Sequence, residues 1–163
     1  MHTIKAVPIT HENFSPFGQF YPMEHPQGYS LDGEIHRFFP DRLTAGAPGR
    51  IGYSPIIVQK PPRMLISAVE YHTTTWEMIL PLTDDMVLHA APASAGTPVT
   101  PLTQAFIIPK NTLVKLNAAI WHLAPLPATQ ENLTAIIILP ECTYANDCTV
   151  VALNKDQQFE IIL

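Results

Sequence analysis

Short apolar runs separated by turn-forming residues make up most of the chain after residue 50. They are rich in Val, Ile, Thr, Phe and Tyr and are bounded by Pro, Asn and Asp, a pattern typical of strands joined by turns. Their spacing is close to the roughly 8 to 12 residues expected of a β-sandwich or barrel. We therefore predict an all-β fold with strands in SPIIVQ (54–59), RMLISAVEYH (63–72), MVLHAAP (86–92), QAFIIP (104–109), TLVKL (112–116), TAIIILP (134–140), CTVVAL (148–153) and FEIIL (159–163).

Proline limits what else the chain can form. The chain contains 17 prolines, and each one removes a backbone donor and disrupts a helix interior, so long helices are excluded. One short helix is predicted in THENFSPFG (10–18), with Thr10 as its N-cap and Gly18 after its end. Residues 22–50 are rich in loop-forming residues, and we expect long excursions there.

Composition places the chain among globular proteins. With 163 residues, 47% of them hydrophobic and 14% charged, it is long enough to bury a sizeable core, and we expect one domain spanning 1–163. The net charge is −5 and the nine Lys and Arg residues are scattered singly, which argues against a nucleic-acid partner.

Several features favour a cytoplasmic protein with no membrane partner. The first residues, MHTIKAVPIT, lack the apolar region of a signal peptide. The longest apolar run, AIIIL (135–139), is far shorter than a membrane span. Cys142 and Cys148 are too few for a disulfide scaffold, and we expect both to be reduced thiols.

The stretch EYHTTTWEMILP (70–81) carries the candidate chemistry. Residues two apart share a face of a strand, so Glu70 and His72 point the same way. Glu77 has the other parity, but a turn through Thr73–Trp76 would let it face the same pocket from the next strand.

A further histidine completes a set of metal-type ligands. His122, in IWHLAPL (120–126), joins Glu70, His72 and Glu77 to form a plausible octahedral site for Mn, Fe, Zn or Ni. We expect the strands around 65–72 and 76–82 to pack beside the strand that carries His122. The alternative is that His72 and His122 are hydrogen-bonded pocket residues without a metal.

This pattern resembles that of the cupins, one class of jelly roll, the architecture with which an all-β domain of this size can protect its sheet edges. The first cupin motif reads H-x-H followed by Glu, and the second ends in a lone His. Glu70, His72 and Glu77 match the first motif with Glu in place of the first His, and His122 matches the second. The resemblance implies a cupin double-stranded β-helix (jelly-roll barrel) with the short helix near its start.

The chain is also similar to one cupin family, the ureidoglycolate lyases. The similarity lies in VPITHENFSPFGQFY (7–21), HRFFPDRL (36–43), EYHTTTWEMILPL (70–82), IWHLAPLPA (120–128) and ANDCTVVAL (145–153). It implies release of urea and glyoxylate from ureidoglycolate, a reaction of allantoin and purine nitrogen catabolism. The chain departs from the family pattern at Asn117, Ala118 and Leu123, and at Glu77, where the family has Gln.

The implied reaction assigns roles to the candidate residues. His72 and His122 are the candidate bases, because imidazole titrates near neutrality. Glu70 or Glu77 would be the acid if burial raised its pKa. Arg63, Lys110 and Lys115 are the candidates to hold the substrate carboxylate.

Two alternatives to a lyase remain open. One is a metal-dependent cupin enzyme of another class, an isomerase or a dioxygenase, acting on a small carboxylate. The other is a non-catalytic cupin that binds a small molecule. In each case we expect a homodimer, because the apolar final run FEIIL provides a strand edge that needs covering.

Overall fold

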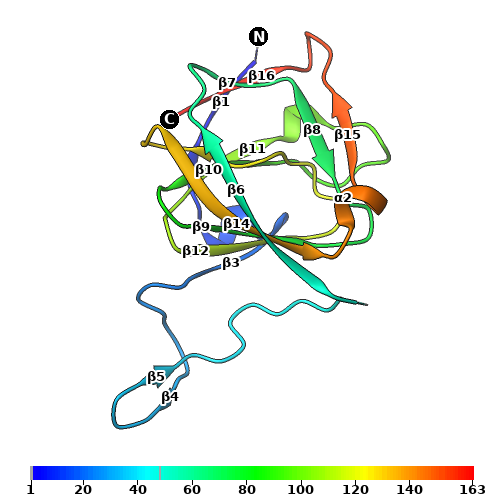
Figure 1. The fold of residues 1–163 in the computed structure, drawn as a ribbon. Coiled ribbons are helices and arrows are strands. Elements are labelled where there is room, and N and C mark those ends of the chain that lie inside the picture. The colour runs from blue at the N-terminus through cyan, green and yellow to red at the C-terminus, as the bar shows by residue number, and fades with distance from the viewer. Residues whose placement is uncertain (1, 48) are drawn as a thin grey trace.

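The computed structural model describes residues 2–47 and 49–163, and its strands confirm the predicted all-β jelly roll (Figure 1). A five-stranded sheet forms one wall. Its strands are, in spatial order, β3 (Gly18–Pro22), β12 (Thr112–Leu116), β9 (Glu77–Pro81), β14 (Asn132–Pro140) and β6 (Ile51–Gln59).

A four-stranded sheet packs against this wall. Its order is β13 (Leu126–Pro127), β10 (Met86–Ala90), β11 (Gln104–Ile108) and β2 (Val7–Pro8). The main core lies between the two sheets, where Ile79 and Val114 of one are fully buried with Leu88 and Phe106 of the other. Alternation fixes which residues face inward. In β14, Leu133, Ala135, Ile137 and Leu139 are buried while the residues between them are half-buried.

Smaller sheets close one end of the barrel. β1 (His2–Lys5), β16 (Phe159–Ile162) and β7 (Met64–Ile66) form one sheet, and β15 (Thr149–Ala152) pairs with β8 (Ala68–Tyr71). The predicted strand 63–72 is thus split at Ser67, because β7 pairs with β16 and β8 with β15. A second core cluster, which includes Trp121 and Phe159, fills the space beneath these strands.

Short helical segments and one projecting hairpin complete the chain. They are α1 (His11–Phe14), a 3₁₀ turn at Thr100–Leu102, α2 (Thr143–Asn146) and the hairpin of β4 (Leu31–Asp32) with β5 (Arg37–Phe38). The hairpin extends away from the barrel (Figure 1), which confirms the excursion predicted for residues 22–50. No helix in the described part of the chain is long and apolar enough to cross a membrane.

The predicted helix at 10–18 is shorter than expected. Thr10 does cap it, accepting a hydrogen bond from the backbone N–H of Asn13 while the Asn13 side chain accepts from the Thr10 N–H. The helix ends at Phe14, and Gly18 begins β3 instead of following the helix. A Cβ atom at Gly18 would overlap the carbonyl oxygen of Lys115 on β12, so glycine permits the close approach of the two strands.

A buried carboxylate fixes the turn that joins β13 to β14. Asp84 accepts hydrogen bonds from the Thr129 N–H at 2.8 Å, the Thr129 hydroxyl at 2.7 Å and the Gln130 N–H at 2.9 Å. Burial alone would raise the pKa of Asp84, but these hydrogen bonds outweigh it and hold the pKa below its ordinary value.

Replacing Asp84 by Ala leaves those donors without their acceptor, and we expect the free energy of unfolding to fall by about 1 to 3 kcal/mol. Because the folded pKa is lowered, the contribution of Asp84 is present above the ordinary aspartate pKa and is lost as the pH falls below it. Denaturant unfolding at neutral and acidic pH measures both effects. Asp156→Ala, at an exposed aspartate, is the control; an equal loss in the two variants would contradict the role of Asp84.

The homodimer stays a prediction, but the expectation that FEIIL provides a free edge is wrong, because β16 pairs with β1 on one side and β7 on the other. The edge strand β6 indicates instead where contact is expected. Tyr53 and Ile57 are each 70% exposed on the same face of β6, and large apolar side chains on a free sheet edge favour association. Light scattering should give twice the 18.1 kDa mass of one chain. The double variant Tyr53→Lys, Ile57→Lys should give the monomer mass, and a monomeric parent chain would refute the prediction.

Candidate functional site

Glu70 and His122 are brought together by the backbone. An isolated antiparallel bridge joins them, with the Glu70 N–H donating to the His122 carbonyl at 2.7 Å and the His122 N–H donating back at 2.9 Å. His122 therefore pairs with β8 as predicted, although it lies in a single bridge instead of a longer strand. A second bridge, between Ala91 and Trp121, ties the same segment to the end of β10.

A turn after β8 brings Glu77 back toward His72, which confirms the predicted strand–turn–strand geometry. Glu77 is the first residue of β9, which lies in the five-stranded sheet. Asp147 holds the turn in place, because its carboxylate accepts hydrogen bonds from the Thr73 N–H at 2.8 Å, the Thr74 N–H at 2.9 Å and the Thr74 hydroxyl at 2.8 Å. The expectation that β9 packs beside the His122 segment needs correction: β9 pairs with β12 and β14, and only its Glu77 side chain reaches the site.

Each histidine is oriented by a backbone carbonyl. Nδ1 of His72 lies 2.8 Å from the Asp147 carbonyl oxygen, and Nδ1 of His122 lies 2.8 Å from the Ile120 carbonyl oxygen. A carbonyl oxygen can only accept a hydrogen bond, so Nδ1 carries the proton in both rings. The Nε2 atom of each ring is left to face the site.

Both Nε2 atoms converge on one carboxylate oxygen. Oε2 of Glu77 lies 2.9 Å from Nε2 of His72 and 3.2 Å from Nε2 of His122. All three side chains are buried. If both rings were neutral, each would direct a lone pair at the carboxylate, an unfavourable arrangement in a buried site. The geometry therefore requires positive charge between these groups, carried either by protons on Nε2 or by a cation.

The pKa shifts have the same origin. Burial alone would raise the pKa of Glu77, but the two imidazoles outweigh it and lower the pKa to about 2. Burial would lower the pKa of His72 and of His122, but the Glu77 carboxylate and the carbonyl contacts raise both pKa values. The expectation that burial makes Glu77 an acid with a raised pKa is therefore wrong.

Glu70 lies on the more open side of the site. Glu70, His72 and His122 offer ligand atoms that all lie within 4.8 Å of one another, a group able to hold a metal ion. Oε1 of Glu70 is 4.0 Å from Nε2 of His122, and its Oε2 accepts a hydrogen bond from the Cys148 thiol at 3.5 Å. Burial and the neighbouring Glu70 carboxylate raise the pKa of Cys148 to about 11, so this thiol stays protonated and donates.

The four predicted site residues, Glu70, His72, Glu77 and His122, are thus brought together. The charged residues proposed to hold a substrate carboxylate are engaged elsewhere: Arg63 forms an ion pair with Glu160, and the Lys115 ammonium donates to the Thr44 carbonyl. Lys110 is exposed on the turn before β12. Of the other histidines, His89 is a buried strand residue whose Nε2 has no hydrogen-bond partner among the described residues, and His2, His11, His25 and His36 are exposed.

Sequence reasoning missed three residues near this site. Asp147 appeared only as part of a family-like segment, Cys148 was predicted only to be a reduced thiol, and Tyr144 was not singled out. Tyr144, on α2, packs edge-on against His72 with ring centroids 5.9 Å apart. Burial and the carboxylates of Glu77 and Glu70 raise its pKa. The acidic-Cys pattern in ANDC was the available signal, but only the pairing of β15 with β8 places it beside the histidines.

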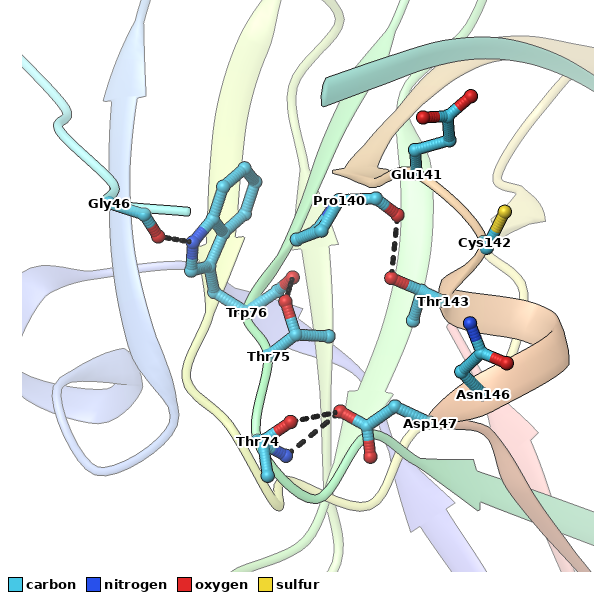
Figure 2. A pocket seen from close by; sticks show the side chains of 10 residues that line it. All are labelled: Gly46, Thr74, Thr75, Trp76, Pro140, Glu141, Cys142, Thr143, Asn146 and Asp147. Atoms are coloured by element: carbon cyan, nitrogen blue, oxygen red, sulfur yellow. Dashed lines mark hydrogen bonds between the residues drawn. The ribbon is translucent and has the colours of Figure 1, made fainter. Parts of the chain in front are cut away.

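A cavity of about 370 Å³ adjoins the turn that carries Thr73–Trp76. Figure 2 shows Trp76 on one side, with its indole N–H donating to the Gly46 carbonyl, and α2 on the other. Thr74 and Asp147 lie at one end of the cavity, joined by the hydrogen bonds described above. Its lining offers hydroxyl and amide groups, a carboxylate from Glu141 and an aromatic face, but no cationic side chain.

The chain belongs to a family described as a domain of unknown function, DUF4867, whose model matches residues 32–162. No curated protein matches the sequence. Among solved structures, a dTDP sugar isomerase from Desulfovibrio desulfuricans G20 is similar with a TM-score of 0.51 and 10% identity, covering 87% of this chain and 89% of that one. RmlC from Streptococcus suis in complex with dTDP-D-xylose gives a TM-score of 0.41 at 9% identity, covering 56% of this chain and 44% of that one.

The similarity to the dTDP sugar isomerase supports the cupin jelly-roll fold, and the family model corrects the family assignment. The resemblance to ureidoglycolate lyases is wrong, because the matching family model is a different one and the similar structure is a sugar isomerase. Ureidoglycolate and allantoin degradation are therefore no longer implied for this chain.

Asp147 is expected to hold His72 indirectly, through the turn that follows it. Replacing Asp147 by Ala should speed amide hydrogen exchange at Thr73 and Thr74 and lower the free energy of unfolding by about 1 to 3 kcal/mol, because these donors lose a charged acceptor. Glu141→Ala, at an exposed carboxylate on the same cavity, is the matched control. Unchanged exchange at both threonines in Asp147→Ala would contradict this role.

Proposed function

We propose that this chain is a metal-dependent cupin enzyme of the isomerase class, which transfers a proton within a small hydroxylated carbonyl compound. One observation carries the proposal. Two imidazoles whose Nδ1–H groups donate to backbone carbonyls direct their Nε2 atoms at one buried carboxylate oxygen. A divalent cation bound here would supply the positive charge that this geometry requires and would neutralise two nearby carboxylates, Glu70 and Glu77.

Glu70, His72 and His122 would hold the ion, with Glu77 as a fourth ligand. Mixed imidazole and carboxylate ligands suit Mn, Fe, Ni or Zn. The carbonyl contacts of both Nδ1 atoms orient the rings for ligation, as outer hydrogen-bond partners of metal-bound histidines usually do. A bound ion would polarise a substrate carbonyl and lower the pKa of a neighbouring hydroxyl.

The proton-transfer groups lie on the open side of the site. Glu70 is 13% exposed in its side chain, against 2% for His72, so a substrate meets this carboxylate first. Glu70 would give Oε1, the oxygen nearer His122, to the ion, and its other oxygen, Oε2, would remove the proton from the carbon beside the substrate carbonyl and return it to the same or the neighbouring carbon. Tyr144, whose raised pKa keeps its hydroxyl protonated, is positioned to donate to the substrate oxygen.

The adjoining cavity favours a hydroxylated substrate. Its neutral Thr74, Thr75 and Asn146 side chains beside the ring of Trp76 suit the hydroxyl groups and apolar face of a sugar or sugar acid. The isomerase with the same fold acts on a sugar, which agrees with this class.

A metal-free small-molecule site is the second candidate. The Glu77 contacts of 2.9 and 3.2 Å are ordinary hydrogen-bond distances, and protonated imidazoles would satisfy them without a metal. This reading also fits a cupin that binds a small molecule without converting it.

Metal analysis of the purified protein tests the proposal. The parent chain should hold a stoichiometric divalent ion, while His72→Ala and His122→Ala should hold less than about a tenth of it, since each loses a ligand. His11→Ala, at an exposed histidine on α1, should retain the metal. Circular dichroism confirms that each variant is folded. A metal-free parent that stays metal-free on reconstitution would refute the metal site.

Deuterium uptake tests the reaction class. In D₂O the metal-loaded parent should introduce deuterium beside the carbonyl of an aldose, a ketose or a 2-hydroxy acid. His72→Ala, His122→Ala and Glu70→Gln should each lose at least about 10²-fold in rate, the usual contribution of one positioned proton-transfer group. A metal-loaded parent that exchanges none of these compounds would refute the isomerase class and leave a metal-containing binding protein.

A further inference from the structure

A second polar site lies in the excursion between β3 and β6, where the chain leaves the barrel (Figure 1). A cavity of about 410 Å³ is lined here by two arginines, Arg37 and Arg42, by the rings of Tyr21 and Phe39 and by the carboxylate of Asp41. A volume of this size is typical of small-molecule pockets.

Arg42 is held between two aromatic rings. Its guanidinium carbon lies 5.6 Å from the centroid of Tyr21 and 5.6 Å from that of Phe39. The Tyr21 hydroxyl is fixed by Gln27, donating to its carbonyl and accepting from its N–H. The left-handed Gly28, at φ 92°, permits this packing, because a Cβ there would lie 3.2 Å from Nη1 of Arg42.

Two nitrogens of the Arg42 guanidinium lack an acceptor, although the residue as a whole is half-buried. Nε and Nη2 of Arg42 are buried and make no hydrogen bond among the residues that the structure describes. Leaving charged donors buried without an acceptor is energetically costly. Arg37, by contrast, is engaged with Asp32 and Ser30.

The orphaned atoms define the missing acceptor. Nε and Nη2 form one edge of the guanidinium, the edge that binds two oxygens of a carboxylate or phosphate in parallel. Both atoms are covered by protein, so an anion in the cavity reaches them when a neighbouring side chain moves aside. We propose that this cavity is a binding site for a small oxyanion, a phosphate or carboxylate group of a metabolite, with Arg42 as its principal ligand. Arg37 supplies a second positive charge, and Asp41 is available to accept from a hydroxyl group of the same molecule.

The site is independent of the candidate metal centre. The hairpin and the strands β8 and β15 lie at opposite ends of the molecule in Figure 1, and the two sets of residues share no member. The inference therefore stands or fails separately from the proposed isomerase.

Nuclear magnetic resonance of the arginine Nε–H groups tests the proposed anion site at Arg42. The chain has only four arginines, Arg37, Arg42, Arg50 and Arg63, and the Arg42 signal is assigned by its loss in Arg42→Lys. The folded full chain is titrated with sodium phosphate and, separately, with sodium acetate, at ionic strength held constant with sodium chloride. The Arg42 signal should shift in a saturable way with at least one anion, while Arg63, at the far end of the barrel, should not respond.

Variants distinguish binding by the paired Nε and Nη2 donors of Arg42 from binding by its positive charge alone. Calorimetric affinity for the responding anion should fall at least about tenfold in Arg42→Lys, which keeps the charge but loses the paired donors. Arg63→Lys should bind as the parent does. Phe39→Leu, which removes one ring and keeps Arg42, should also weaken binding, and it serves if Arg42→Lys fails to fold.

Three results would overturn the proposal. The first is an Arg42 signal that responds to neither anion. The second is undiminished affinity in both Arg42→Lys and Phe39→Leu. The third is an Arg42 signal that moves with protein concentration and not with anion, which would assign the acceptor to a second copy of the chain.

Discussion

The candidate site depends on one constraint, the hydrogen bonding of two imidazole Nδ1–H groups to backbone carbonyls. Once Nδ1 of His72 is bound to the Asp147 carbonyl and Nδ1 of His122 to the Ile120 carbonyl, both Nε2 atoms must find a partner at the Glu77 carboxylate. In water, solvent molecules could hydrogen-bond to the Nε2 atoms and to the carboxylate separately, and the groups could move apart at little cost. In a buried site, where solvent cannot compensate, it demands a proton or a metal ion between the groups.

The barrel keeps these groups together because each comes from a different part of the sheet arrangement. Glu70 and His122 are neighbours through backbone pairing, whereas Glu77 belongs to the five-stranded sheet and reaches them by its side chain. The end of α2 joins the two parts, since Asp147 accepts from the turn with its carboxylate and from His72 with its carbonyl. The position of Asp147, and with it the geometry of the site, therefore depends on the pairing of β15 with β8.

The all-β fold and the four site residues could be predicted from the sequence for physical reasons. The same reasons explain which element boundaries and site residues could not. Strand periodicity and proline spacing identify β-structure locally, and the shared parity of Glu70 and His72 requires only one strand. The break at Ser67, the length of α1 and the position of β9 depend on which strands pair, information that lies outside any single segment. Tyr144 and Asp147 were missed for the same reason, and the direction of the Glu77 pKa required knowing that two imidazoles contact one oxygen.

Access to the site follows from the unequal burial of its residues. His72, Glu77 and His122 are closed off, while Glu70 is partly open and Tyr144 is 57% exposed on α2. Glu70 is therefore the site carboxylate more accessible to solvent. Because Cys148 donates to Glu70 and keeps its proton, one oxygen of this carboxylate is held and the other is directed toward His122. The α2 segment contributes to the site twice, since Tyr144 packs against the ring of His72 and the carbonyl of Asp147, at the end of the helix, accepts from its Nδ1.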